Sequence, residues 1–505
     1  MSYIKSYKNQ NYLIPPNLKD LFSKDHVCYM IEQIANDLDY SKFDEMYAGA
    51  GHPAYHPSIN VKLLLMAYID GIKSSRRIAK NAQENVVYIY LAEKTQPDFR
   101  TISDFRKDNQ DFIKNVFKQV NSFALDQGLI DLSHLMIDGT SIKADANNEK
   151  VIDAKTLDKL DKYIDKVIKE GIKIDEEEDK IYKDRGFHEL PKDLTDSEKR
   201  RPIVRKIIKK INDSIKKGEK KEVEKIKSDL QNIKQVVDEK GLNKYSFVDP
   251  DSKFMLNKKK GYELSYNAQL VVEKNGLIIS NDVINKGDDR NQLVANVNRV
   301  EEDFGELREG TRISADAGYV KGKDMEKLED KKFDLYIPVR NIAKITDKDK
   351  FKKSSFTYDP EKDVYVCPMN KILKNVGTYF DKSSQQNRTQ FVSKKKECGV
   401  CKHKLECCKK QKRKKISATP YDQMFNRIKE KLNTEEGWAI YNLRKQTVER
   451  SIGDIKQNKS FRSFLLRGLK KVKSEFNLVC IAHNLVLINN KLNMKRAMMS
   501  IDSNC

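Results

Sequence analysis

The stretch His134-Leu-Met-Ile-Asp138-Gly-Thr-Ser-Ile-Lys-Ala-Asp145 decides the fold of this chain. Apolar residues lead into an aspartate and a Gly-Thr-Ser turn follows, which predicts a short buried strand that ends at Asp138. Open α/β sheets build their sites at the carboxyl ends of strands. A carboxylate buried there must be paired, hydrogen-bonded or bound to metal, because isolated buried charge is very unfavourable. The alternative is that Asp138 only caps its own turn.

The composition favours a polyanionic partner. The 505 residues include 97 Lys and Arg against 75 Asp and Glu, so the net charge is +22. Nucleic acid is the first candidate partner and an acidic membrane surface the second, although a lysine-rich surface can also be merely solvated. No apolar run approaches the roughly 18 residues of a membrane span, and the start of the chain lacks a signal-peptide core. We therefore expect a cytoplasmic protein with no membrane partner.

Residues 1–125 show apolar residues at helical spacing and predict a helical N-terminal DNA-binding domain. One helix opens at Ser74, with Arg76 and Arg77 in its first turns, and a second carries Arg106. Paired basic helices of this kind fit a helix-turn-helix DNA binder. A plain helical bundle with solvated arginines fits the pattern about as well.

Residues 130–150 and 245–345 predict an α/β core. Strand-like alternation runs over residues 261–272, Asn275-Gly276 is a hairpin signal, and a strand-aspartate-glycine pattern returns at Asp316. Three antiparallel strands followed by βα units describe a ribonuclease H-like mixed sheet. Between the two parts, residues 151–244 are rich in Lys, Glu and Ile and predict a charged helical insertion that serves as a solvated arm.

Residues 350–430 form a Cys-rich insertion. Cys367, Cys398, Cys401 and Cys407 have the spacing of a zinc ribbon or knuckle, and they would supply four thiolates to one structural Zn²⁺. Cys408 or His403 could replace one of the four. The rival interpretation is a set of free cysteines in a basic loop, and the lysines and arginines of residues 409–415 could contact phosphates.

Residues 431–495 predict C-terminal helices that complete the catalytic core. Lys445, Glu449 and Lys456 are spaced to lie along one stripe of a single helix. Asp138 and Asp316 are predicted at strand ends, and Glu449 could pack across the same edge. Carboxylates brought together repel one another, and two Mg²⁺ or Mn²⁺ ions relieve this repulsion and promote phosphodiester cleavage.

These motifs resemble those of bacterial insertion-sequence transposases of the DDE type. The resemblance covers nearly the whole chain. It rests on His56-Pro57, Ser74-Ser75-Arg76, Pro97-Asp98, Thr101-Ile-Ser-Asp-Phe-Arg106, Ile137-Asp-Gly-Thr140, Asp249-Pro-Asp251, Phe254-Met255, Gly261-Tyr-Glu-Leu-Ser-Tyr-Asn-Ala-Gln269, Ala315-Asp-Ala-Gly-Tyr319, Val448-Glu-Arg-Ser-Ile-Gly-Asp-Ile-Lys456, Phe461-Arg-Ser-Phe-Leu-Leu-Arg-Gly468 and the cysteine block.

The resemblance implies that Asp138, Asp316 and Glu449 bind two catalytic metal ions. It also implies cleavage at the terminal inverted repeats of an element, joining to target DNA, and a homodimer in the DNA complex, which would lie at the nucleoid. Lys456 would contact phosphates near the cut. The family's arginine lies one residue closer to the glutamate than Arg444 does, so either Lys445 takes its role or Arg444 reaches round the helix.

Three other functions compete with transposition. A ribonuclease H-like nuclease would use the same carboxylates to cut without joining. A DNA-binding protein from a decayed element would bind the repeats and be catalytically silent, although all three acidic residues are present. A zinc-stabilised RNA-binding protein would explain the charge and the cysteines but not the aspartates.

Overall fold

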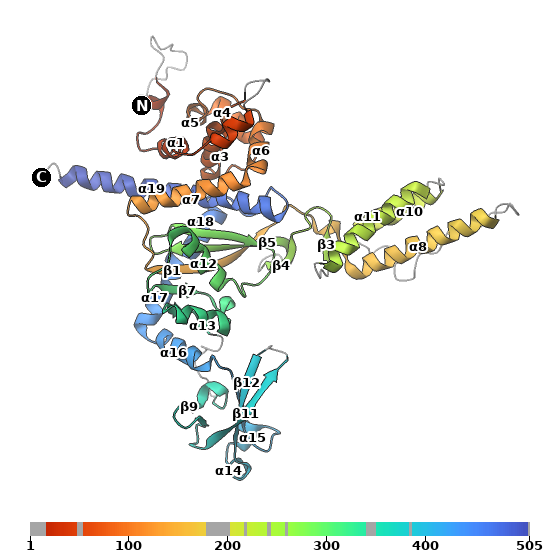
Figure 1. Ribbon diagram of the computed structural model, residues 1–505. Helices are drawn as coiled ribbons and strands as arrows, with labels where there is room; N and C mark the ends of the chain where they lie inside the picture. Colours follow the sequence, from red (N-terminus) through yellow and green to blue (C-terminus); the bar gives the residue numbers. More distant parts are fainter. Residues whose placement is uncertain are drawn as a thin grey trace, which may run out of the picture.

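The computed structural model describes residues 17–47, 54–177, 202–216, 220–239, 244–257, 261–339, 350–382 and 386–502. A central sheet lies beneath the N-terminal helices, a helical arm projects to one side, and a small second sheet hangs below (Figure 1). In these ranges, no helix combines the length and the apolar character that a bilayer crossing requires.

The central sheet is mixed, in the order β4-β5-β1-β7-β8, with β6 also paired to β5. β1 pairs antiparallel with β5 and parallel with β7, and β8 continues the parallel side. Its strands are β1 (His134–Lys143), β4 (Lys253–Asn257), β5 (Gly261–Glu273), β6 (Ile278–Ile284), β7 (Arg312–Ala315) and β8 (Asp334–Tyr336). The hairpin predicted at Asn275-Gly276 is confirmed between β5 and β6, and Gly276 has the φ of +93° that favours glycine.

The prediction that the first strand ends at Asp138 is wrong. β1 continues without a turn through Gly139, Thr140 and Ser141 to Lys143. The cause is β5, which pairs with β1 residue by residue as far as Lys143. A partner strand of this length satisfies the backbone groups that a turn would otherwise have satisfied, so the turn signal is overridden.

One face of the sheet is covered by the N-terminal helices and two C-terminal helices. The long helix α19 packs against α7, α3 and β6 (Figure 1), and one hydrophobic core runs from the N-terminal helices through α19 to the sheet. These helices are η1 (Leu18–Leu21), α1 (Cys28–Asn36), α2 (Ser41–Tyr47), α3 (Pro57–Ile69), α4 (Ser75–Glu84), α5 (Val86–Leu91), α6 (Phe99–Asp108), α7 (Gln110–Asp126), α18 (Val448–Gln457) and α19 (Leu469–Asp502).

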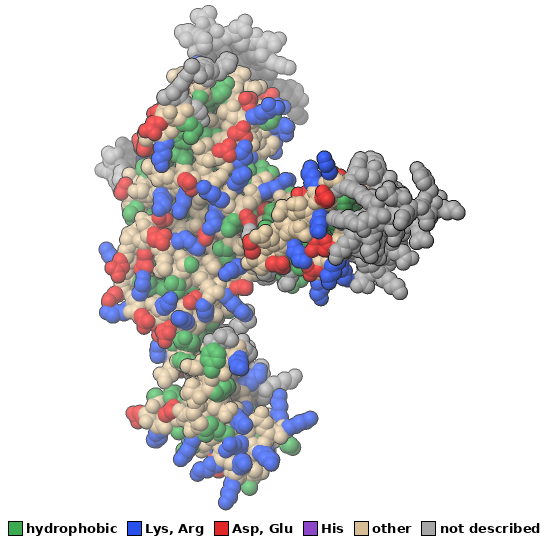
Figure 2. All heavy atoms as spheres, turned by 45° about the vertical axis from the view of Figure 1, so that its right-hand side comes forward, with side chains coloured by type: hydrophobic (Ala, Val, Ile, Leu, Met, Phe, Trp, Pro, Cys, Tyr) green, Lys and Arg blue, Asp and Glu red, His purple; other side chains and the backbone are tan. Residues whose placement is uncertain are grey.

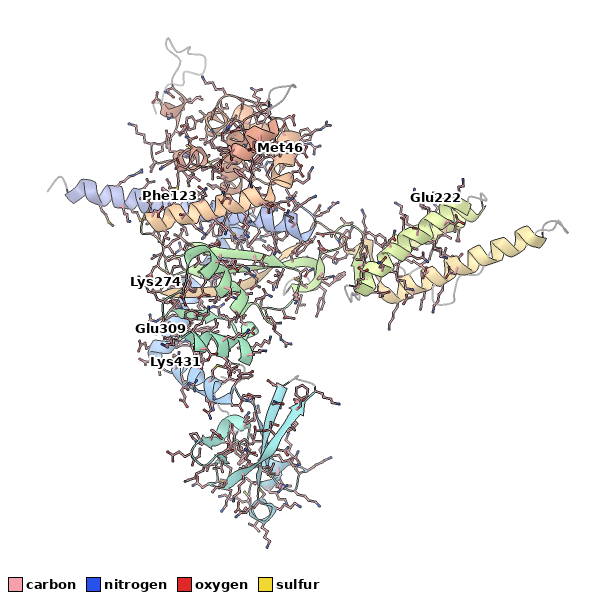
Figure 3. All side chains as sticks on the ribbon, viewed as in Figure 1. Met46, Phe123, Glu222, Lys274, Glu309 and Lys431 are labelled. Atoms are coloured by element: carbon pink, nitrogen blue, oxygen red, sulfur yellow. The ribbon has the colours of Figure 1, made fainter. Side chains whose placement is uncertain are left out.

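The other face carries α12 (Leu293–Phe304), α13 (Gly322–Asp330), α16 (Asp422–Leu432) and α17 (Glu435–Gln446), and a second core lies beneath them. α16 is held against β8 by Lys431, whose Nζ lies 4.6 Å from the ring centre of Tyr336 and also pairs with Asp334 (Figure 3). This contact brings the chain back to the sheet after the Cys-rich insertion.

The helical insertion forms the arm at the right of Figure 1. Its elements are η2 (Asn148–Lys150), β2 (Val151–Asp153), α8 (Ala154–Glu177), α10 (Pro202–Lys216), α11 (Lys220–Glu239) and β3 (Lys244–Ser246). The arm has a hydrophobic core of its own, and ion pairs such as Lys210 with Glu222 (2.6 Å) lie on its surface (Figure 3).

The Cys-rich insertion is a separate antiparallel sheet in the order β13-β12-β11-β10-β9, with a small core. Its elements are η5 (Lys353–Ser355), β9 (Thr357–Asp359), β10 (Val364–Val366), β11 (Ile372–Asp381), β12 (Gln386–Ser393), α14 (Lys395–Gly399), α15 (Lys404–Cys408) and β13 (Lys415–Ala418). It follows β8 and precedes α16, so it extends from the end of the central sheet.

Candidate active site at the edge of the central sheet

Asp138 and Asp316 lie at one edge of the central sheet because their strands run side by side. β1 and β7 are parallel, and their last paired residues are Ile137 and Ala315. The next residue of each chain segment is an aspartate. The two carboxylates influence each other electrostatically, and this repulsion raises the pKa of Asp138. The register therefore puts like charges together, an arrangement that needs a compensating cation.

Asp138 is largely buried, and burial raises the pKa of its carboxyl group to about 6. The guanidinium of Arg444 opposes this shift, with Nη2 3.0 Å from Asp138 Oδ2. The backbone N–H of Gly139 also donates to Oδ1 at 2.8 Å. Arg444 is itself only 5% exposed, so this is a buried ion pair in which each charge depends on the other.

Asp316 is the first residue after β7 and caps the short helix η3 (Ala317–Tyr319). Its Oδ1 accepts a hydrogen bond of 2.8 Å from the N–H of Gly318. A Cβ on Gly318 would lie 2.9 Å from that same oxygen. The glycine of the Asp-Ala-Gly motif is therefore needed for the close approach of the backbone to the carboxylate.

Glu449 lies in the first turn of α18 and is exposed. The expected single helix is wrong, because Thr447, with φ −115° and ψ −96°, separates α17 from α18. The Thr447 hydroxyl donates to the carbonyl of Leu443 at 2.8 Å and also contacts the Met136 sulfur, which ties the break to β1. Glu449 interacts electrostatically with Tyr441, as Asp316 does.

The three predicted carboxylates do not converge as they stand. In the described part of the chain, no three His, Cys, Asp or Glu side chains are placed to hold one metal ion. The donor set itself fits a hard divalent cation, because carboxylate oxygens are the ligands that Mg²⁺ and Mn²⁺ prefer. The two aspartates share the edge, whereas Glu449 is exposed in the first turn of α18.

Lys456 crosses β1 beside Asp138. Its Nζ donates to Thr140 Oγ1 at 2.5 Å and to the carbonyl of Ser141 at 3.0 Å. Burial lowers the pKa of Lys456, and the charge of Asp138 opposes this shift. Lys445 is exposed, whereas Arg444 points inwards to Asp138. Lys445 and Arg444 are the two residues that could take the role of the arginine in the family's motif, and of these Arg444 lies at the sheet edge.

Two family models match this chain. One, described as "Transposase DDE domain", matches residues 366–488, and the other, "Transposase domain (DUF772)", matches residues 16–108. Both matches are to transposase domains, and together they support an insertion-sequence transposase of the DDE type. Comparisons with curated proteins and with solved structures find no match. The first match contains Glu449 and Lys456, and Asp138 and Asp316 lie outside both matched ranges.

The second match contains the three arginines predicted to bind DNA. Arg76 and Arg77 are exposed on α4, and the Arg76 guanidinium lies 4.6 Å from the ring centre of Phe99. Arg106 is buried, with Nη1 2.7 Å from the carbonyl of Lys73, and it interacts with the buried Glu475 of α19. Arg106 therefore joins α6 to the core, and its burial does not fit a direct DNA contact.

The cysteines of the Cys-rich insertion share one pocket. Cys367, Cys398, Cys401, Cys407 and Cys408 all line it. Ser393 Oγ lies 2.9 Å from the Cys398 sulfur, and burial raises the pKa of Cys408 to about 12. His403 instead faces Glu406, 3.3 Å from its Nδ1. In the described residues, no group of His, Cys, Asp or Glu side chains is placed to hold a metal ion, so zinc binding is not confirmed. The thiols are nevertheless close enough to influence one another electrostatically.

Sequence reasoning missed a further acidic residue at the edge, Asp289. It lies in the loop between β6 and α12, and its Oδ1 accepts hydrogen bonds from Asn267 Nδ2 at 2.8 Å and Gln269 Nε2 at 2.6 Å. Burial raises its pKa, and Asp316 adds to the shift. The signal that could have found it is the one that found Asp138 and Asp316, an aspartate shortly after a strand.

Proposed function

We propose that this chain is a transposase that binds the terminal inverted repeats of an insertion sequence, cleaves the DNA there and joins the end to target DNA. The observation that carries the proposal is the parallel register of β1 and β7, which sets Asp138 beside Asp316 in a chain with two transposase domains. The order β6-β5-β1-β7-β8, antiparallel and then parallel, supports a ribonuclease H-like core.

Asp138, Asp316 and Glu449 are the residues proposed to hold two Mg²⁺ or Mn²⁺ ions. Bound there, these ions supply activation of the attacking oxygen and neutralisation of the leaving oxygen. Binding needs Asp138 to leave Arg444 and Glu449 to turn towards the edge. The planar guanidinium of Arg444 would then be free to donate two parallel hydrogen bonds to a DNA phosphate. The ammonium group of Lys456 beside it would contribute a compact positive charge.

The proposed chemistry has two balanced displacements. Water attacks the phosphodiester at the element's end, the bond from phosphorus to the 3′-oxygen breaks, and a 3′-hydroxyl and a 5′-phosphate result. That 3′-hydroxyl attacks a phosphodiester of target DNA, forms the new bond to phosphorus and releases a target 3′-hydroxyl. Because the sheet edge holds the groups in place, the enzyme contributes positioning and electrostatics rather than a covalent nucleophile.

The distribution of charge supports DNA as the partner. Residues 350–421 contain 19 Lys and Arg against 6 Asp and Glu, a net charge of +13 out of +22 for the whole chain. Lys and Arg side chains gather over the lower end of the molecule, where this insertion lies (Figure 2). The N-terminal helices with Arg76 and Arg77 are proposed to recognise the repeats, and two copies of the chain to pair the two ends at the nucleoid.

A structural Zn²⁺ in the cysteine pocket belongs to the same proposal. Cys367, Cys398, Cys401 and Cys407 would hold it, and Cys408, which lines the same pocket, is the better substitute than His403. We expect purified wild type to carry zinc and the double variant Cys398→Ser, Cys401→Ser to lose it, as measured by elemental analysis. Zinc-free wild type would contradict this assignment without affecting the catalytic proposal.

The decisive experiment measures cleavage and joining of DNA that carries the element's own ends, with Mg²⁺ or Mn²⁺. We expect Glu449→Gln to bind this DNA but to cut at least about 100-fold more slowly than wild type. Glu435→Gln, at the first-turn position of α17, is the matched control and should cut normally. Wild type that binds without cutting would instead support the silent DNA-binding protein, and cutting without joining would support a nuclease.

A further inference from the structure

The strand β11 of the Cys-rich insertion exposes four large apolar side chains. Ile372, Val376, Tyr379 and Phe380 are each between 44% and 56% exposed. An antiparallel strand with one solvated face normally keeps its apolar residues on the buried face and polar residues on the other. Single apolar residues scattered over a surface need no explanation, but four on one strand of ten residues form a patch of the kind that marks an interaction site.

The two exposed aromatic residues lie where the sheet narrows to two strands. β10 pairs only with the first residues of β11, and β13 pairs with β12 only as far as Thr389. β11 and β12 continue to pair as far as Asp381 and Gln386, and they project beyond the rest of the insertion as a ribbon (Figure 1). Successive side chains of a strand point to opposite faces, so Tyr379 and Phe380 present one ring on each face of this ribbon.

The face that carries Tyr379 is also basic. The register sets Tyr379 opposite Arg388, and it sets Lys374 and Lys415 on either side of Val392. Arg388 and Val392 point to the same face of β12, so Tyr379 and both lysines share that face. Arg388 is already ion-paired. The two lysines are exposed and form no ion pair within the described residues, so they are the cations available to a partner.

Aromatic rings beside unpaired lysines fit a single nucleic acid strand. Lysines pair with phosphates, and exposed aromatic rings stack on bases with little regard to their sequence. A duplex would satisfy only the lysines, because its bases are already stacked on one another. A second copy of the chain fits less well, because it would bring together two insertions that each carry a net charge of +13 over residues 350–421, and these would repel.

We infer that the β11–β12 ribbon binds unpaired nucleotides of a DNA strand. Tyr379 and Phe380 stack on bases, and Lys374 and Lys415 pair with phosphates. The inference rests on the proposed function and deepens it, because a strand end freed by cleavage can separate from its partner strand, and the ribbon would hold it. Since stacking is indifferent to the identity of the base, the ribbon holds this strand without selecting a sequence.

The test measures binding of the full-length protein to a fluorescent oligo(dT) of about 16 nucleotides, and to a duplex of the same length, by anisotropy. EDTA in the buffer prevents cleavage of either probe. Tyr379→Leu with Phe380→Leu keeps apolar side chains on the ribbon and removes only the rings. We expect this double variant to bind oligo(dT) at least about tenfold more weakly than wild type, and to bind the duplex within about twofold of wild type.

Tyr262→Leu is the matched control. Tyr262 is 66% exposed on β5 of the central sheet, so its replacement removes an exposed ring from a strand outside the ribbon. This variant should bind both probes as wild type does. Thermal melts of all variants show whether they are folded.

Four results would overturn the inference. Unchanged binding of oligo(dT) by the double variant would exclude stacking on these rings, and an equal loss for both probes would point to a groove of the duplex. If oligo(dT) binding is unchanged but binding to phosphatidylserine vesicles is lost, the ribbon contacts an anionic membrane. If oligo(dT) binding is unchanged but self-association in sedimentation is lost, it contacts a second copy of the chain.

The cleavage assay with Glu449→Gln remains separate from this test. If wild type cuts and joins DNA while the double variant binds oligo(dT) normally, the inference alone fails. If wild type binds oligo(dT) through the two rings but never cuts, the proposed function alone fails.

Discussion

At the scale of the residue, ionisation of Asp138 opposes folding. Its pKa is about 6 in the folded protein and 3.8 in an ordinary aspartate, so the folded state binds the proton more tightly. Stability contributed by this group is therefore present near pH 4 and falls as the pH rises to about 6. We expect wild type to lose stability relative to Asp138→Asn as the pH rises from 4 to 7.5 in EDTA.

The same comparison at pH 4 provides the control, because wild-type Asp138 is then largely protonated and resembles asparagine. The difference in the free energy of unfolding, measured with urea, should shrink towards zero there. A difference that does not change with pH would mean that packing, rather than charge, separates the two proteins.

Gly139 provides a second test at the residue scale. Alanine there would place a Cβ 2.4 Å from Asp289 Oδ1 and 2.5 Å from Gln269 Nε2, so the site must shift. We expect Gly139→Ala to lower the cleavage rate by about 100-fold, as misplacement of reacting groups can do. Gly453→Ala in α18, where no atom lies within 4 Å of the added Cβ, is the control. It should cut normally and gain about 0.5–1 kcal/mol of stability.

At the scale of the element, the break between α17 and α18 decides which side chains face the sheet edge. An unbroken helix would have put Lys445, Glu449 and Lys456 on one stripe. The break at Thr447 instead leaves Arg444 at Asp138 and Lys456 at Thr140, with Lys445 and Glu449 exposed.

The Thr447 hydroxyl should therefore stabilise this local structure. Thr447→Val keeps the shape of the side chain but removes the hydrogen bond to the Leu443 carbonyl. We expect a loss of about 1 kcal/mol in the free energy of unfolding by urea. Gln446→Ala, at the exposed preceding position, should change stability by less than about 0.5 kcal/mol. Equal effects of the two variants would argue against a specific role of the hydroxyl.

At the scale of the whole molecule, the positive charge is concentrated in the Cys-rich insertion, which lies far from the N-terminal helices in the sequence. The Cys-rich insertion carries more than half of the net charge, and its lysines at 409, 410 and 412 are exposed. We expect this insertion to contact phosphates without reading bases. Contacts of that kind release counterions and make binding depend steeply on salt.

Removal of two of these lysines tests that expectation. We expect Lys410→Gln with Lys412→Gln to weaken DNA binding and to reduce the slope of log affinity against log salt by up to about 2. Lys221→Gln with Lys225→Gln removes the same charge from exposed positions on α11 of the arm and should leave the slope unchanged. An equal reduction in both variants would point to the total charge of the protein rather than to the insertion.

Local chemistry made much of the fold predictable. Apolar periodicity identified the helices of the N-terminal region, and alternation with Asn275-Gly276 identified the β5–β6 hairpin. The strand-aspartate pattern located Asp138 and Asp316, whose strands the structure places in register. Asp289 shows the same kind of signal more weakly, because a loop separates it from β6 and nothing in its neighbours marks it as buried.

The sequence by itself determined the likeness to transposase domains, the strands that lead to Asp138 and Asp316, and the excess of basic residues, since each depends on residues close together in the chain. Only the tertiary structure decided that β1 runs past Asp138, that the helix breaks at Thr447, that Arg106 is buried and that Asp289 and Arg444 meet the aspartates. The reason is physical. Most of these features depend on partners more than a hundred residues away, on β5, β1 and α19. Local preferences yield when such partners satisfy buried backbone and charge.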